Sequence, residues 1–336
     1  MDLLTLKQIE DAITEAGAKE VHVQAFFRAW MHNRAFEKGS MRYPKAAYEV
    51  MLRLRREMDA AAEIVQEAVG ADGSARLVLK MADGQLIESV VLPREGLCVS
   101  TQVGCAVGCV FCMTGKGGLI RQLTDFEIAA QLALARRRCK VGKVVFMGMG
   151  EPSHNLRNAL SALDFMAVYG EIGYKNLVLS TVGDRRLFKE LETRAIKPAL
   201  ALSLHTADNE KRRKLLPNSQ NIPVEELTAF ASKYAKIGRY PVQYQWTLMK
   251  DVNDGDDEIE KLREVWKDQF AVLNMIPVNT VEDSPFERPD AERLAKLKEA
   301  FTSEHILVKF RDSAAQEVDG GCGQLRARYQ AENAEE

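Results

Sequence analysis

From residue 96 onward the sequence alternates between short apolar runs of strand type and longer patterns of helical type. The strand-like runs are Leu97–Ser100, Lys143–Met147, Asn176–Ser180, Ala199–Leu204, Val242–Met249 and Phe270–Ile276. The clearest helical pattern, Thr124–Arg138, begins with Thr124 and Glu127 at the spacing of a capping box. This alternation predicts a parallel sheet with helices outside it. Six units are too few for a closed eight-stranded barrel, so we predict an α/β fold with an open partial (β/α)6 barrel.

The first 95 residues follow a different pattern, which predicts a small accessory domain. Apolar residues recur at helical spacing over Ala25–Phe36 and Ala46–Val69. The runs Ala75–Met81 and Leu86–Leu92, joined by a turn at 82–84, predict a β-hairpin. We therefore place a helical and β-hairpin extension at 1–95. The barrel and a C-terminal catalytic segment follow at 96–336, with Ile306–Phe310 as the last strand.

Composition narrows the class of protein. No window of the 336 residues approaches the roughly 18 apolar residues of a membrane span. The acidic, amphipathic start lacks the features of a secretory signal, so we expect a cytoplasmic protein. In that reducing compartment the six cysteines are not expected to be disulfide staples. The net charge of −2 gives no overall argument for binding nucleic acid.

The cysteines crowd into one short segment, which indicates metal binding or catalysis. Cys105-Ala-Val-Gly-Cys109-Val-Phe-Cys112 forms a Cx3Cx2C motif in the loop after the first barrel strand. Three thiolates can hold three irons of a 4Fe–4S cluster and leave the fourth iron open to a small molecule. A zinc site that lacks its fourth ligand, or buried structural cysteines, are alternative interpretations.

This motif, with an aromatic residue before its third cysteine and a partial barrel after it, resembles the radical S-adenosylmethionine (SAM) superfamily. The resemblance implies a 4Fe–4S cluster held by Cys105, Cys109 and Cys112. It further implies that SAM binds to the open iron and is cleaved reductively to a 5′-deoxyadenosyl radical.

Polar residues follow the next strands at their carboxyl ends, where an open α/β sheet binds its ligands. Gly148-Met-Gly150-Glu151-Pro152 comes after the second barrel strand, and its glutamate could bind the ammonium group of a ligand. A plain strand-to-helix turn with a solvent-facing glutamate is the alternative. Ser180, Ser203-Leu204-His205 and Asn279 lie at later strand ends, and each alone could be a cap or turn residue. Together they suggest a shared ligand.

A longer set of motifs resembles the RlmN/Cfr family of radical SAM methyltransferases, which act on adenine carbons of ribosomal RNA. The motifs are Cys98-Val-Ser-Thr-Gln-Val-Gly-Cys105, Met147-Gly-Met-Gly-Glu-Pro152, Ser203-Leu-His205 and Gly321-Cys-Gly-Gln-Leu325. The resemblance implies methylation of C2 or C8 of adenine in 23S rRNA, and possible action on tRNA. It also implies SAM contacts by Gly150, Glu151, Ser180, Ser203, Leu204, His205 and Asn279.

The family mechanism assigns roles to three further residues. It implies that Cys322 takes a methyl group from one SAM and that a radical from a second SAM removes a hydrogen from it. The resulting methylene radical adds to the adenine ring, and Cys98 then frees the product by forming a transient disulfide with Cys322. Glu88 is implied as the base for the ring proton, and strand alternation puts it on an apolar face. An exposed glutamate at a hairpin edge is the alternative.

Two other functions remain open at this point. One is a radical SAM enzyme that acts on another substrate, against which the pair Cys98 and Cys322 argues. The other is a non-catalytic iron–sulfur RNA-binding module. For the methyltransferase we expect RNA and a reductase as partners, no membrane, and a monomer.

Overall fold

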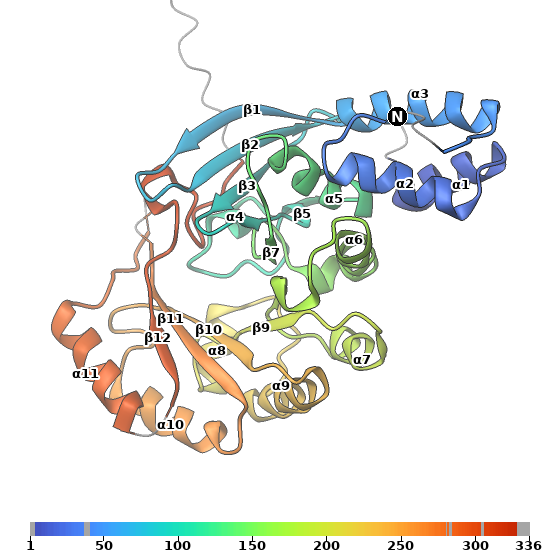
Figure 1. Ribbon diagram of the computed structural model, residues 1–336. Helices are drawn as coiled ribbons and strands as arrows, with labels where there is room; N and C mark the ends of the chain where they lie inside the picture. The colour runs from blue at the N-terminus through green and yellow to red at the C-terminus, as the bar shows by residue number, and fades with distance from the viewer. Residues whose placement is uncertain (1–3, 37–40, 280, 282–283, 304–305, 328–336) are drawn as a thin grey trace, which may run out of the picture.

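In the computed structural model, which describes residues 4–36, 41–279, 281, 284–303 and 306–327, one large sheet runs through the molecule (Figure 1). Its strand order is β1-β2-β3-β4-β7-β8-β9-β10-β11-β12 among the described residues. The barrel strands are β4 (Gly96–Cys98), β7 (Lys143–Phe146), β8 (Leu177–Thr181), β9 (Ala199–Ser203), β10 (Val242–Leu248), β11 (Ala271–Pro277) and β12 (Val308–Phe310). Each pairs in parallel with its neighbours in this series, which confirms the predicted open partial barrel.

Helices connect the parallel strands and cover the outside of the sheet (Figure 1). They are α5 (Asp125–Ala135), α6 (Leu156–Val168), α7 (Arg185–Thr193), α8 (Asn209–Leu215), α9 (Val224–Gly238), α10 (Asp256–Trp266) and α11 (Ala291–Ser303). Helix α5 begins with the predicted capping box, in which the Thr124 hydroxyl accepts the N–H of Glu127 and the Glu127 carboxylate accepts the N–H of Thr124. The start of this helix therefore follows the local sequence pattern.

The strands β1 (Ala62–Val69), β2 (Ala75–Met81) and β3 (Leu86–Leu92) form an antiparallel extension of the barrel sheet. The prediction of a helix over Ala46–Val69 is wrong beyond residue 60, where α3 (Lys45–Ala60) ends and β1 begins. The helical spacing of apolar residues continues beyond residue 60, but pairing with β2 makes residues 62–69 a strand. Because β3 pairs with β4, the sheet crosses residue 95, and the predicted domain boundary there stays a prediction.

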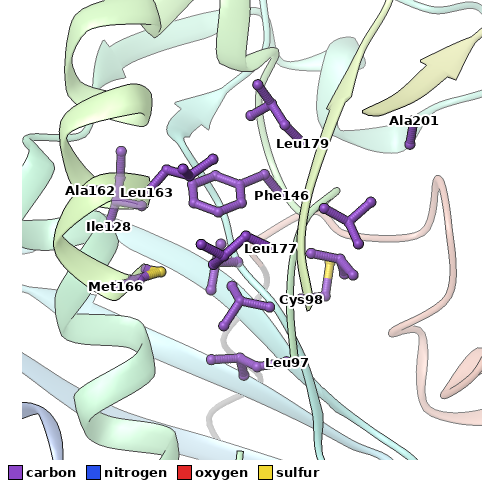
Figure 2. Packing of buried hydrophobic residues seen from close by; sticks show 14 of the residues in the cluster. Leu97, Cys98, Ile128, Phe146, Ala162, Leu163, Met166, Leu177, Leu179 and Ala201 are labelled. Carbon is purple, nitrogen blue, oxygen red and sulfur yellow. The ribbon is translucent and has the colours of Figure 1, made fainter. Parts of the chain in front are cut away.

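The N-terminal helices share their core with the barrel. Helices α1 (Leu6–Glu15) and α2 (Glu20–Met31) carry buried apolar faces, and Trp30 of α2 stacks on Phe126 of α5 with ring centroids 5.3 Å apart. Deeper in the barrel, Figure 2 shows Phe146 and Leu177 of the sheet against Leu163 of α6, within the same cluster of buried residues. Within the described residues, no helix is long and apolar enough to span a membrane.

A short hairpin brackets the cysteine motif. Strand β5 (Gln102–Gly104) precedes the motif, the one-turn helix α4 (Met113–Lys116) follows it, and β6 (Leu119–Gln122) pairs back onto β5. Gly104 has a φ of +79°, and a Cβ built there would lie 2.0 Å from the carbonyl oxygen of Gly118. Only glycine fits this crossing, which closes the loop that carries the cysteines.

Candidate active site

A cavity of about 150 Å³ lies at the carboxyl ends of the barrel strands, where an α/β sheet is expected to bind its ligand. Side chains from the cysteine motif, the strand ends and the C-terminal segment line it. Among the predicted site residues these are Cys105, Cys109, Cys112, Gly150, Glu151, Ser180, Ser203, His205 and Cys322. The fold therefore brings nine residues spread over more than half of the chain to one place.

The three motif cysteines border this cavity from one side. Hydrogen bonds tie their loop to the barrel: the N–H of Val110 donates to the carbonyl of Leu215, and Asn218 donates from its backbone N–H to the carbonyl of Val107 and from Nδ2 to that of Ala106. Across the described part of the chain, no three His, Cys, Asp or Glu side chains converge tightly enough to hold one metal ion. The thiols of a 4Fe–4S cluster need not do so, because each of them binds a different iron.

Burial strongly disfavours the thiolate form of these cysteines in the absence of a cation. It raises the pKa of Cys105 to about 12, and it also raises the pKa of Cys109 and of Cys112. The buried Arg212 lies near enough to Cys109 and Glu151 that their negative charges raise its pKa against the stronger effect of burial, which lowers it to about 10. A bound cluster would supply the positive charge that the thiolates of Cys105, Cys109 and Cys112 require, one of them buried and two partly buried.

Glu151 lies in the wall of the cavity and is 5% exposed, so the alternative of a solvent-facing glutamate is wrong. Its Oε1 accepts the hydroxyl of Thr181 at 2.7 Å and the N–H of Ser153 at 3.0 Å, and its Oε2 accepts the N–H of Val182 at 3.0 Å. These donors fix the carboxylate beside the cavity. A carboxylate has room for about four hydrogen bonds, so Oε2 can still accept one from a ligand.

The glycines before Glu151 are required by packing against the chain. A Cβ at Gly148 would lie 2.7 Å from the Ser100 hydroxyl, and one at Gly150 would lie 2.6 Å from the Cβ of Gln102. Gly150 also has a φ of +101°. Both glycines thus allow the close approach of residues 99–102 to this turn.

His205 faces the cavity as a neutral imidazole. Its Nδ1 accepts the N–H of Thr247 at 3.0 Å, which leaves the ring proton on Nε2. Complete burial lowers the pKa of His205 to about 3, and the charge of Arg212 contributes. The ring meets Phe111 of the cysteine motif with centroids 4.9 Å apart, so one contact links the β9 strand end to the cluster loop.

Two predicted SAM contacts lie outside the cavity lining. The side chain of Leu204 is fully buried in the core. Asn279 donates from Nδ2 to the Ser313 hydroxyl and to the carbonyl of Cys322, both at 2.9 Å, while its buried Oδ1 has no partner among the described residues. The structure therefore records Asn279 as a support for the loop of Cys322, and contact of either residue with SAM stays a prediction.

Gln245 and Thr247 of β10 line the cavity and were missed by the sequence analysis. The buried Oε1 of Gln245 has no hydrogen-bond partner in the described part of the protein. The run Gln243, Gln245, Thr247 places polar residues at every second position of an otherwise apolar strand. That alternation is the signal that could have identified an inward polar face.

Cys98 and Cys322 are neighbours although they are far apart in the sequence. Cys98 is buried on β4, and Cys322 is exposed at the edge of the cavity. Burial raises the pKa of Cys98 to about 12, and the nearby Cys322 adds to the rise. Cys322 also acts in the same direction on Cys112. The C-terminal segment thus brings its cysteine to the cavity that the cluster motif lines, near enough to affect both Cys98 and Cys112.

Glu88 is fully buried, so the alternative of an exposed glutamate at a hairpin edge is wrong. Residue pairing across β3 and β4 sets Val90 opposite Cys98, which puts Glu88 on the same face of the sheet as Cys98. Burial raises the pKa of Glu88 above its usual range, against hydrogen bonds from Ala327 and Arg76. The residue does not border the cavity, and its role as a base stays a prediction.

Comparison with known proteins agrees with this site. Residues 99–264 match the Radical SAM superfamily. A probable RNA methyltransferase of Bordetella avium is 53% identical over 318 residues, which cover 93% of this chain and 90% of the relative. One of Leptothrix cholodnii is 51% identical over 330 residues, covering 97% and 95%.

Solved structures lead to the same family. A radical SAM methyltransferase from Sphaerobacter thermophilus superposes with a TM-score of 0.85 at 30% identity, over 97% of this chain and 98% of that chain. The radical SAM family uses a 4Fe–4S cluster and SAM, and the residues around the cavity suit both. The relatives are named as methyltransferases, so the protein is an enzyme that transfers methyl groups, and the alternative of a non-catalytic RNA-binding module is rejected. The chain belongs to the radical SAM RNA methyltransferases.

Proposed function

We propose that this enzyme methylates a ring carbon of adenine, C2 or C8, in RNA, with 23S rRNA as the first substrate to test and tRNA as the second. The observation that carries the proposal is that Cys322 borders the cavity and lies close enough to Cys98 to raise the pKa of Cys98, because most radical SAM reactions need neither cysteine. The relatives named as RNA methyltransferases support RNA as the substrate class. The position of the methyl group rests on the motif resemblance.

Some of the cavity residues would bind the cluster, and the others would bind SAM. Cys105, Cys109 and Cys112 would hold three irons, and Glu151 would accept a hydrogen bond from the ammonium group of SAM. We propose that Gly150, Ser180, Ser203, Leu204, His205 and Asn279 complete the SAM site. When bound, the cluster supplies the electron for reductive cleavage of SAM.

Cys322 takes the first methyl group in this proposal. A new S–C bond forms at its sulfur as the sulfonium–methyl bond of SAM breaks, and S-adenosylhomocysteine and the thiol proton leave. The 5′-deoxyadenosyl radical from a second SAM would take a hydrogen atom from this S-methyl group and leave as 5′-deoxyadenosine. The methylene carbon then bonds to the adenine ring, and Glu88 accepts the ring proton.

Cys98 completes the proposed cycle. Its thiolate attacks the Cys322 sulfur, so that an S–S bond forms while the S–CH2 bond breaks and the released carbon takes up a proton. One electron is left over, and a bound cluster would be its acceptor. Two electrons and two protons from a reductase partner then restore both thiols. Such a cycle suits a reducing cytoplasm and needs only one copy of the chain, so we keep both expectations.

The test separates the two cysteines. Cys322→Ala should lose methyl transfer to RNA while it keeps SAM binding. Cys98→Ala should complete the early steps and then retain RNA on Cys322 as an adduct that survives denaturation and shortens under nuclease. Absorbance at 260 nm of denatured protein, with mass spectrometry of the Cys322 peptide, measures the adduct.

The double variant Cys98→Ala/Cys322→Ala is the control and should carry no RNA. Cys139 lies outside the cavity lining and gives a matched single control. The Cys139→Ala enzyme should stay active and carry no attached RNA. A fully active Cys98→Ala enzyme without bound RNA would contradict the mechanism.

A further inference from the structure

The C-terminal segment, residues 311–327, folds back onto the β1–β3 extension (Figure 1). The N–H of Ala315 donates to the carboxylate of Asp72, in the turn between β1 and β2, at 3.2 Å. A Cβ built at Gly320 would lie 3.3 Å from the Cβ of Arg76, so the backbone two residues before Cys322 lies directly against β2. The part of the chain that carries Cys322 is thus held by strands that precede the barrel.

The strongest contact in this interface centres on Glu88. Its Oε2 accepts the N–H of Arg326 at 2.8 Å and the N–H of Ala327 at 3.1 Å, and its Oε1 accepts Nη1 of Arg76 at 2.6 Å. Arg76 lies opposite Val90 in the hairpin, so Arg76 and Glu88 are diagonal neighbours on one face of the sheet. The Glu88 carboxylate, the two N–H groups and the Arg76 guanidinium thus meet at a place where Glu88 has no exposed surface.

Two other elements hold the same segment from the side of the cavity. The N–H of Met113 donates to the carbonyl of Gly323, and the hydroxyl of Thr114 donates to that of Leu325, both at 2.8 Å. Asn279 donates to the carbonyl of Cys322. Carbonyls at 322, 323 and 325 therefore point to the barrel, while amides at 326 and 327 point to Glu88.

This arrangement requires an ionised Glu88. A carboxylate with no exposed surface loses its charge unless a cation or several donors compensate for the lost water. Arg76, whose side chain is 11% exposed, is the cation in contact with it. Without Arg76, burial would favour the neutral acid, which is a weaker acceptor for the two backbone amides. Arg76 can therefore affect the C-terminal segment through Glu88.

We propose that Arg76 and Glu88 position Cys322, by docking the C-terminal segment onto the β1–β3 extension. This inference rests on the proposed function for its catalytic consequence, and it gives Glu88 a role apart from that of a base. Arg76 is a positioning residue, since it is not among the described residues that line the cavity. The extension then serves methyl transfer by setting where the Cys322 sulfur stands relative to the methyl donor.

A positioning role and a base role predict different effects on the first half-reaction. Methylation of Cys322 by SAM involves no adenine ring proton, so loss of a base alone leaves it unchanged. Loss of docking slows it, because displacement at a methyl carbon needs the attacking sulfur in line.

The experiment uses cluster-loaded enzyme under anaerobic conditions, with Glu88→Ala, Glu88→Gln and Arg76→Met. Hydrogen exchange of peptides that span residues 320–327 reports docking and needs neither SAM nor RNA. Mass spectrometry of the Cys322 peptide after addition of SAM alone reports the rate of its methylation.

For Glu88→Ala and Arg76→Met we expect exchange at Arg326 and Ala327 to rise roughly tenfold or more, since a hydrogen bond to a charged group is lost. Methylation of Cys322 should fall by roughly the same factor. Glu88→Gln keeps a neutral acceptor, and its methylation rate should lie between those of wild type and Glu88→Ala.

Arg194→Met is the matched control. Arg194 is an arginine of 18% exposure that is paired with Asp164 on the helical side of the barrel, and its loss should leave both readouts unchanged. Unchanged exchange in Glu88→Ala and Arg76→Met would overturn the docking. Faster exchange with an unchanged rate of Cys322 methylation would overturn the positioning role. Absence of Cys322 methylation in the wild-type enzyme would instead reject the proposed function, with the docking readout intact.

Discussion

Single buried side chains set the chemistry of the cavity, and His205 illustrates how strongly burial shifts the pKa of such a side chain. Its Nδ1 is committed to the backbone of Thr247, and its ring packs on Phe111. The backbone at His205 has a φ of +64°, a conformation that is uncommon outside glycine and that asparagine, aspartate and histidine adopt more often than other residues. A protonated ring at this position would lose its acceptor role and would bury an uncompensated charge.

His205 should therefore make the protein less stable in mild acid. Its pKa of about 3 in the folded state lies below its ordinary value of 6.5, so below pH 6.5 the unfolded chain binds more protons than the folded one. The free energy of unfolding falls as the pH drops from 6.5 toward 3, by about 2 kcal/mol at pH 5 from this residue.

Chemical denaturation at pH 7 and pH 5 measures this effect. His205→Asn can keep both the acceptor for Thr247 and the positive φ, and it should lose less stability between the two pH values than wild type does. Equal losses in both proteins would show that another group dominates the acid response.

The helices and strands position the reactive side chains of the site through the places where their ends meet. The turn after β7 supplies Gly150 and Glu151, but it holds its shape because it packs on the β4–β5 connection. The N–H of Glu151 donates to Oε1 of Gln102 at 2.8 Å, which fixes the backbone of the turn at Glu151. Packing of one strand end on the next therefore sets the position of the carboxylate.

Gly150→Ala should damage this turn severely. The new Cβ would overlap Gln102, and the positive φ would be strained, so we expect a loss of at least about 2 kcal/mol in unfolding free energy. SAM affinity should fall as well, because Glu151 would move.

Gly173→Ala is the control for this prediction, because its φ is −59° and no atom lies within 4 Å of the added carbon. Its stability should be unchanged or slightly higher. Thermal unfolding of both variants, with a calorimetric titration of SAM, provides the comparison. Equal stability of the two variants would contradict the packing argument.

Across the whole molecule one hydrophobic core joins the N-terminal helices to the barrel. Trp30 and Phe27 of α2 contact Phe126 and Phe165 on α5 and α6. Together with the continuous sheet, this core means that the extension and the barrel stabilise one another. Unfolding of the two parts should therefore be coupled.

Trp30→Ala tests that coupling. Removal of this fully buried ring should cost about 3–5 kcal/mol and lower the midpoint of one common thermal transition in calorimetry. Leu52→Ala on α3, which is 38% exposed, should change stability by less than about 0.5 kcal/mol. A second transition that appears in Trp30→Ala while the main one stays in place would show that the N-terminal helices unfold on their own.

Local sequence patterns were enough to predict much of this protein. Strand–helix alternation gave the open barrel, since apolar periodicity reflects which face of each element is buried. The Cx3Cx2C motif and the Gly-Met-Gly-Glu-Pro turn pointed to residues that line the cavity, because short motifs carry their chemistry within one loop. The capping box of α5 was equally local.

Contacts between distant parts of the chain could not be obtained in that way. Strand β1 looked helical by spacing, and its pairing with β2 depends on residues farther along the chain. The family resemblance named Glu88 and Cys322, but no periodicity indicated that Arg76 would neutralise Glu88 or that Glu88 would hold the backbone after Cys322. The sequence pattern also did not indicate that Asn279 donates a hydrogen bond to the carbonyl of Cys322. Such contacts arise when the sheet closes and the C-terminal segment folds over it, and burial then fixes which polar groups must be paired.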